Sequence, residues 1–301
     1  MPAPATSDDT LQTTGRFYAM VESLHKFDQQ EVKGVIRTLL STSERERCFI
    51  ATYYRASGNV ASLLELKQPR HFQAIAMLAR SLFELAIDIK LIDLIPDGPI
   101  KIREFTDVEK LRSVHKILRF KAANPSVAVD TTIYSSFVAN NKRRIDAAKS
   151  SLWATTKTLS HWSGLHISER AELVKSPLQE IYEVKYPMLS WYVHSGITGV
   201  VNLDGESFTV LCGVAFQIVT EAYRELLLAV IGELKIAKAD EKIEGKLEVA
   251  RYLPFTDTPE QVETVVRHTS RSDRWTSPSR SLHSVVDPRS RLNCLGRDDS
   301  E

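Results

Sequence analysis

Cysteine is scarce in this 301-residue chain, and the three that it has, Cys48, Cys212 and Cys294, lie far apart. An odd number of distant cysteines without CxxC spacing argues against a disulfide framework or a zinc knuckle. Glycine and proline are also few, at 12 each, so the chain lacks the frequent turns of a β-barrel or β-sandwich. A hydrophobic content of 43% still supplies a core. The composition therefore favours a helical protein of the reducing cytoplasm.

A charge excess of either sign is missing, since 39 Lys and Arg residues face 38 Asp and Glu residues. The whole chain is thus neither a basic nucleic-acid coat nor an acidic tail. The first ten residues carry acids where a secretory signal needs Lys or Arg and an apolar run. The most apolar stretch, residues 208–234, contains Gln217, Glu221, Arg224 and Glu225, which favour a buried bundle helix over a membrane span. We expect a cytoplasmic protein without a membrane segment.

Nucleotide and metal fingerprints are absent from the sequence. Neither GxxxxGK[ST] nor GxGxxG occurs, and no HExxH pattern accompanies the histidines. We therefore expect no cofactor and no metal. The nucleophile elbow GxSxG is missing too, which argues against serine hydrolase chemistry.

Apolar residues recur every three or four positions from Phe17 to about Ala250, a pattern that predicts an all-α multi-helix bundle. Gly58 and Pro96 end two of the predicted helices, and Thr106 with Glu109 forms a Thr-x-x-Glu capping box that opens another. The clearest predicted helices cover residues 44–56, 71–95, 106–122 and 130–150. Residues 16–268 form the predicted helical domain, between disordered segments 1–15 and 269–301, the latter rich in Ser and Arg without a period.

A narrow polar stripe runs along the predicted helix 71–95, which is otherwise almost entirely apolar. At about 100° per residue, its members fall within roughly a quarter turn: Gln73, Arg80, Ser81, Glu84 and Asp88. Arg80 and Glu84 have the i,i+4 spacing of a hydrogen-bonded ion pair. Two interpretations stay open, an ordinary solvent face with weak pairs or a functional site on a mostly buried helix.

Two further segments combine histidine with aromatic residues. In YPMLSWYVHSG, Ser190 and His194 share one helix face at i,i+4, and a histidine can exchange a proton near neutral pH. A buried histidine that is merely satisfied by Ser190 is the alternative. His161 begins the second segment, HWSGLH, which we interpret as a turn between helices.

Basic residues are concentrated in one region. Residues 101–160 contain 12 Lys and Arg residues against five acids, a net charge of +7. The cluster Lys142, Arg143 and Arg144 is the candidate for contacts with the phosphates of RNA or DNA. Solvated helix faces are the commoner explanation for such a count.

Three phrases, ARSLFELAIDIKLI (79–92), HWSG (161–164) and YPMLSWYVHSG (186–196), resemble the bacterial domain of unknown function 5677. The resemblance covers about residues 40–235 and implies an all-helical domain. Its motifs, carried over residue by residue, imply a site made of Arg80, Glu84, His161, Tyr186, Ser190 and His194. That family is similar in architecture to HEPN-like helical nucleases of toxin and antiphage systems. The present chain departs from their motif, because no Arg lies five to seven residues before any of its eight histidines.

These patterns lead to two functional hypotheses. In the first, the protein is a metal-independent ribonuclease in which His194 transfers protons, Arg80 stabilises charge on the phosphate and Glu84 holds Arg80. Ser190 and Tyr186 would orient the histidine. In the second, the same residues form a non-catalytic polar network, and the protein acts through a partner protein or as a homodimer. A catalytic cluster should open to a cleft near the basic region, whereas a structural one should be closed and hydrogen-bonded.

Overall fold

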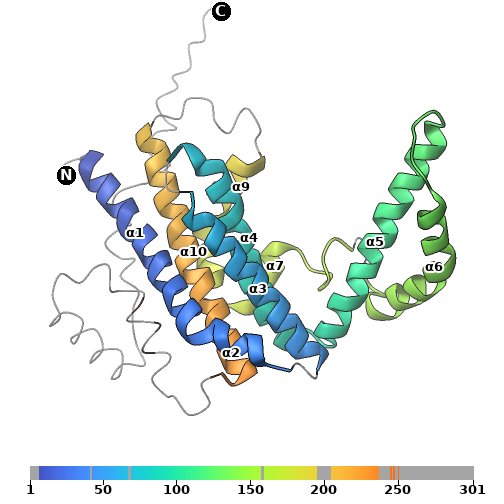
Figure 1. The fold of residues 1–301 in the computed structure, drawn as a ribbon, viewed down its shortest axis with the longest axis horizontal. Coiled ribbons are helices and arrows are strands. Elements are labelled where there is room, and N and C mark those ends of the chain that lie inside the picture. The colour runs from blue at the N-terminus through green and yellow to red at the C-terminus, as the bar shows by residue number, and fades with distance from the viewer. Residues whose placement is uncertain are drawn as a thin grey trace, which may run out of the picture.

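The structure is a computed structural model that describes residues 7–40, 43–66, 69–156, 159–194 and 205–236, together with 245, 247 and 250. Every regular element in these ranges is helical, which confirms the predicted all-α class (Figure 1). In chain order the elements are α1 (Ser7–Phe27), the π-helix η1 (Asp28–Val32), α2 (Lys33–Thr38), α3 (Glu44–Leu64), the 3₁₀ turn η2 (Pro69–His71), α4 (Phe72–Leu94), α5 (Gly98–Ala123), α6 (Thr132–Leu152), α7 (Ile167–Val174), α8 (Leu178–Val184), α9 (Tyr186–His194) and α10 (Gly205–Leu234).

The core lies between α1, α3, α4 and α10, which run side by side (Figure 1). Large side chains from several helices meet there without solvent contact, among them Tyr53, Phe72, Phe83 and Tyr223. The helix α10 is apolar on nearly all sides because it packs against both α1 and α4. Within the described ranges, no helix has the length and apolarity that a membrane span requires.

A buried carboxylate anchors the junction of α1 and α2. Asp28 begins the π-helix η1 and has no exposed surface. Its Oδ1 accepts a hydrogen bond from the Tyr53 hydroxyl at 2.6 Å, and its Oδ2 accepts one from Ser57 Oγ at 2.9 Å. Both donors lie on α3, so these bonds fix the entry of the chain into α2 against the bundle.

Three helices have other bounds than the sequence predicts. The helix α3 continues through Gly58 to Leu64, because Val60 and Leu63 are buried in the core. The helix α5 begins at Gly98, so the Thr106 capping box is wrong: the Thr106 hydroxyl bonds to the Ile102 carbonyl inside the helix. The helix α1 begins at Ser7, within the segment 1–15 that is predicted to be disordered.

The helices α5 and α6 form an arm that projects from the bundle (Figure 1). The first half of α5 packs on α3 and α4, whereas α6 packs on α5. A separate small core, made of Val108, Leu111, Ile145, Trp153 and Leu159, holds the two helices together. We call residues 98–152 the α5–α6 arm. The last part of the predicted helical domain, residues 251–268, and the predicted disordered tail 269–301 lie outside the described residues.

Candidate functional site

The polar stripe of α4 faces two other parts of the chain. Ser81 accepts a hydrogen bond from Asn59 of α3 at 3.0 Å. Arg80, Glu84 and Asp88, one turn apart, instead face α7, α9 and the 161–164 turn. We call these three residues the α4 polar row. Glu84 and Asp88 form hydrogen bonds with residues of other elements, so the row is not an ordinary solvent-exposed face.

Arg80 and Glu84 meet Tyr186, the first residue of α9. Arg80 Nε donates to Glu84 Oε1 at 2.8 Å, and the Tyr186 hydroxyl donates to the same oxygen at 2.7 Å. The Arg80 guanidinium also lies 5.3 Å from the centre of the Tyr186 ring, in a cation–π contact. The packing of Phe83 on Tyr186, with ring centres 5.1 Å apart, holds α9 in this position.

The environment of Tyr186 favours its neutral, hydrogen-donating form. Burial is the main cause that raises the pKa of Tyr186 to about 12, and the hydrogen bond to the Glu84 carboxylate adds to it. At neutral pH the phenol is therefore a fixed donor to Glu84, and it is unsuited to act as a base.

One turn further along α4, Asp88 holds His161 and Arg170. Arg170 Nη1 donates to Asp88 Oδ1 at 2.8 Å, and His161 Nε2 lies 3.2 Å from Asp88 Oδ2. The same Arg170 atom is 2.9 Å from His161 Nε2. Arg170 comes from α7, and its side chain is only 8% exposed. A buried arginine needs such a carboxylate, because an unpaired buried charge is costly.

The second ring nitrogen of His161 is engaged as well. His161 Nδ1 accepts a hydrogen bond from the backbone N–H of Ser163 at 3.2 Å and lies 2.8 Å from Ser163 Oγ. Since Nδ1 is an acceptor, Nε2 carries the proton of the neutral ring and donates to Asp88. Gly164 closes this turn at φ 78°, where an added Cβ would lie 3.0 Å from Thr156 Oγ1. The HWSG sequence thus builds a tight turn that presents His161 to Asp88.

The remaining residues of the predicted site lie further along α9. Ser190 Oγ is buried, and its interaction with the Tyr186 hydroxyl acts to lower the pKa of that phenol, against the larger effects of burial and Glu84. The side chain of His194 lies outside the described residues, so the predicted pairing of Arg80 with His194 stays a prediction. Contacts of Phe83 with Tyr186 and of Phe72 with Tyr192 show that α9 runs antiparallel to α4. The helix therefore carries the backbone of His194 about 12 Å beyond Tyr186, toward the start of α4.

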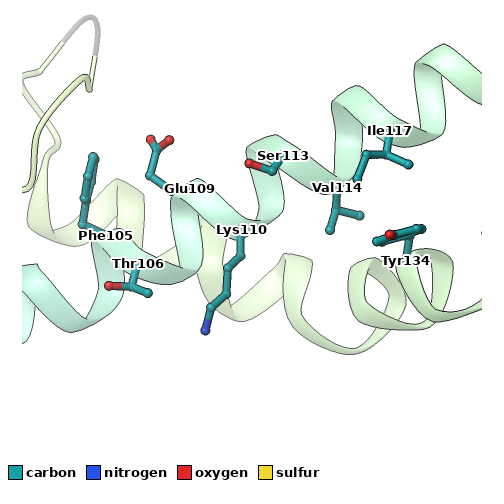
Figure 2. Close-up of a pocket in the computed structure, with 8 residues that line it drawn as sticks. All are labelled: Phe105, Thr106, Glu109, Lys110, Ser113, Val114, Ile117 and Tyr134. Atoms are coloured by element: carbon teal, nitrogen blue, oxygen red, sulfur yellow. The ribbon is translucent and has the colours of Figure 1, made fainter. Parts of the chain in front are cut away.

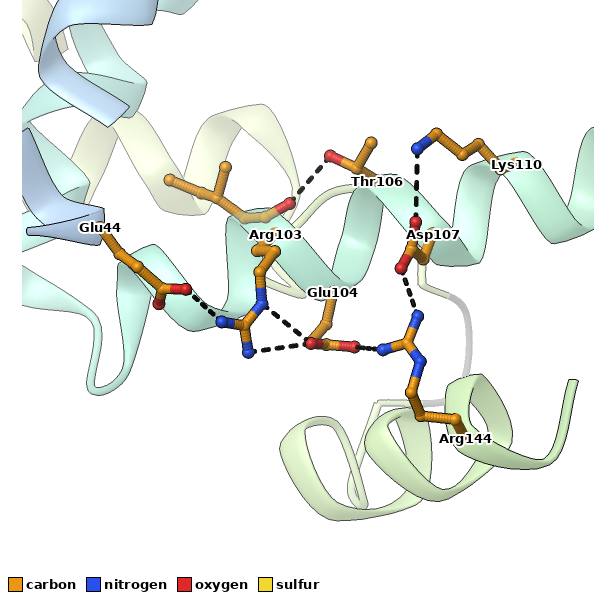
Figure 3. A network of polar contacts seen from close by, with 8 residues as sticks. Glu44, Arg103, Glu104, Thr106, Asp107, Lys110 and Arg144 are labelled. Atoms are coloured by element: carbon orange, nitrogen blue, oxygen red, sulfur yellow. Dashed lines mark hydrogen bonds and ion pairs between the residues drawn. The ribbon is translucent and has the colours of Figure 1, made fainter. Parts of the chain in front are cut away.

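The predicted phosphate-binding cluster lies on α6 (Figure 1), where Arg144 contacts the half of α5 that packs on the bundle. Arg144 is paired with Glu104 and Asp107 of α5, as Figure 3 shows, and Lys142 pairs with Asp146. Arg143 is exposed and takes part in no ion pair with the described residues. Two of the cluster's three cations are therefore neutralised by acids of the arm.

Comparison with protein families identifies a match over residues 47–207, more than half of the chain, to the model of a family of unknown function, DUF5677. The chain belongs to the DUF5677 family. The matched range runs from α3 to the start of α10, so it includes the α4 polar row, the HWSG turn, α9 and the whole α5–α6 arm. No curated protein and no solved structure matches the chain in the corresponding searches.

Sequence reasoning on the DUF5677 motifs missed two members of this network, Arg170 and Ser163. Arg170 lies in the short helix α7, whose sequence ISERAELV carries no feature that distinguishes this arginine from a surface residue. Ser163 belongs to the HWSG segment, but the spacing of these residues does not predict that Ser163 contacts the ring of His161. Among the described residues no cluster of His, Cys, Asp or Glu has the arrangement of a metal site.

Proposed function

We propose that this DUF5677 protein is a non-catalytic interaction module. In this proposal the α4 polar row fixes α7, α9 and the HWSG turn on the bundle, and the α5–α6 arm contacts a protein partner. One observation carries the first part: both ring nitrogens of His161 are already engaged, since Nδ1 accepts a hydrogen bond from the Ser163 backbone and Nε2 donates to Asp88. A general acid or base needs a ring nitrogen within reach of its substrate.

The charge balance of the row supports the same function. Arg80 is paired with Glu84, and Arg170 is paired with Asp88, so two cations meet two anions. Each arginine is thus neutralised by a neighbouring carboxylate, which weakens its attraction for a phosphate. A groove along α5 is lined by none of the three residues of the row, although its lining residue Phe105 contacts His161, with ring centres 6.4 Å apart.

A metal-independent ribonuclease is the second candidate, and one observation favours it. An imidazole oriented by a carboxylate and flanked by a guanidinium, as in Asp88, His161 and Arg170, is a recurring arrangement for proton transfer and phosphate stabilisation. In this candidate His161 or His194 transfers protons, Arg80 stabilises charge on the phosphate and Glu84 holds Arg80. Lys142, Arg143 and Arg144 bind the RNA backbone, and the resemblance to nucleases of toxin and antiphage systems supplies the substrate class.

Incubation with labelled total RNA in EDTA separates the two candidates. We expect the wild-type protein to cleave RNA no faster than a buffer blank, and His161→Ala and His194→Ala to behave identically. His115→Ala, on α5, is the matched control, and circular dichroism checks that each variant is folded. Cleavage by the wild type and His115→Ala that is lost in either of the other variants would establish the ribonuclease and contradict the interaction module.

A further inference from the structure

The α5–α6 arm buries little of its own surface. The helices α5 and α6 have 26 and 21 residues, yet Ile145 is the one fully buried residue of α6 in the described structure. Near the far end of the arm, the side chains of Phe120 and Ile133 are 55% and 75% exposed. Helices in proteins are stabilised chiefly by packing of an apolar face. The arm therefore has apolar surface to offer to a partner.

An open groove of about 540 Å³ runs along α5, with Tyr134 of α6 at the end near Ile117 (Figure 2). Its apolar lining consists of Phe105, Val114 and Ile117 of α5 and Tyr134 of α6. Figure 2 shows Glu109 and Lys110 on opposite sides of this face. From Phe105 to Ile117 the face is about 18 Å long, which matches about three turns of a partner helix.

Most acidic residues of the arm form ion pairs, whereas many of its basic residues do not. Four of its five acids, Glu104, Asp107, Glu109 and Asp146, form ion pairs with cations of the arm, several of them drawn in Figure 3. The cations that form no ion pair with the described residues are Lys101, Lys116, Arg119, Lys121, Arg143 and Lys149. Lys116 follows Ser113 by three residues and so shares the face of the groove. The arm thus presents an apolar groove with a surplus of positive charge.

We propose that this groove binds an amphipathic helix of another protein, with an apolar face flanked by acidic residues. The inference rests on the proposed interaction module and names its partner chemistry. Exposed aliphatic side chains such as Ile133 favour a protein over RNA, because interfaces with nucleic acids are polar and use cations and stacking rings. A second copy of the arm is disfavoured, because two arms of net charge +6 would repel each other.

The probe is a fluorescein-labelled peptide of about 20 residues, with leucine at i, i+3, i+4 and i+7 and glutamate at the flanking positions. The matched probe has lysine in place of every glutamate. We expect the full-length protein to bind the acidic peptide at least about tenfold more tightly than the basic one in fluorescence anisotropy, with the difference reduced by added salt. Equal binding of the two peptides, or binding of neither, would overturn the inference.

Variants locate the binding on the protein. Ile117→Asn, in the groove, should weaken binding of the acidic peptide about tenfold or more, since the substitution places an amide against the apolar face of the peptide. Lys116→Glu should weaken binding of the same peptide severalfold. Lys26→Glu, at an exposed position on α1, should leave the affinity for the acidic peptide unchanged. Unchanged affinity in Ile117→Asn, with circular dichroism showing a folded protein, would contradict docking in this groove.

Two further measurements separate this inference from the proposed function. Tighter binding of a single-stranded RNA oligomer than of the acidic peptide would overturn the inference in favour of nucleic acid. A dimer in sedimentation velocity that Ile117→Asn dissociates would overturn it in favour of a second copy. Loss of peptide binding without RNA cleavage contradicts the helix partner alone, whereas RNA cleavage that requires His161 or His194 contradicts the proposed function itself.

Discussion

Replacing Asp28 by alanine lowers the free energy of unfolding by about 3–5 kcal/mol. The side chain has no exposed surface, and its carboxylate accepts hydrogen bonds from Tyr53 and Ser57. Alanine would leave both hydroxyls buried without an acceptor, and each such group costs about 1–3 kcal/mol. Urea unfolding followed by circular dichroism measures the loss.

Two controls define the cause of this effect. Asp28→Asn keeps one acceptor oxygen and should lose clearly less stability than Asp28→Ala. Asp93→Ala removes a carboxylate whose side chain is 57% exposed, and should change the free energy of unfolding by less than about 1 kcal/mol. A loss below about 1 kcal/mol in Asp28→Ala would show that the buried network does not hold α1 and α2 on the bundle.

Asp88→Ala is the second large effect, with an expected loss of about 2–4 kcal/mol. The substitution removes the carboxylate that pairs with the buried Arg170 and orients His161. Breaking a fully buried pair costs about 3–5 kcal/mol, and the 25% exposure of Asp88 reduces this figure. Glu84→Ala should lose less, about 1–2 kcal/mol, because the Glu84 side chain is a third exposed.

A double variant distinguishes a structural role of Asp88 from a chemical one. Asp88→Leu combined with Arg170→Met replaces the pair by apolar side chains of similar volume, and should recover most of the stability that Asp88→Ala loses. Thermal unfolding of the single and double variants provides the comparison. If the double variant is no more stable than Asp88→Ala, the ion pair is not what fixes α7 on α4.

Apolar periodicity and proline positions predict helix bounds correctly where packing with distant parts of the chain does not override them. Residues 71–95 were predicted as one helix, and α4 spans Phe72–Leu94, because an apolar period is followed by Pro96. Gly58 was predicted to end a helix, but the burial of Val60 and Leu63 outweighs the weak helix propensity of glycine. The start of α5 was missed because Pro99 is tolerated in the first helical turn.

The sequence predicts which residues belong to the candidate site, but it predicts only some of the contacts between them. Spacing placed Arg80, Glu84 and Asp88 on one face, and the structure brings Tyr186 to Glu84 and His161 to Asp88. Which helix covers that face depends on packing between elements distant in the chain, so Arg170 carried no recognisable signal. The position of Lys142, Arg143 and Arg144 on a projecting arm likewise follows from tertiary structure, which one sequence does not reveal.

Amide hydrogen exchange, followed by mass spectrometry with and without the acidic peptide, tests most directly whether a protein partner completes the arm. Without peptide, we expect residues 98–152 to exchange much faster than α4, because only Val108, Leu111 and Ile145 of this range belong to the small core that holds the arm together. Saturating peptide should slow exchange along α5 and leave α4 unchanged. Protection of the free arm equal to that of α4, or exchange in α5 that peptide does not slow, would contradict the proposal that the arm is a binding element.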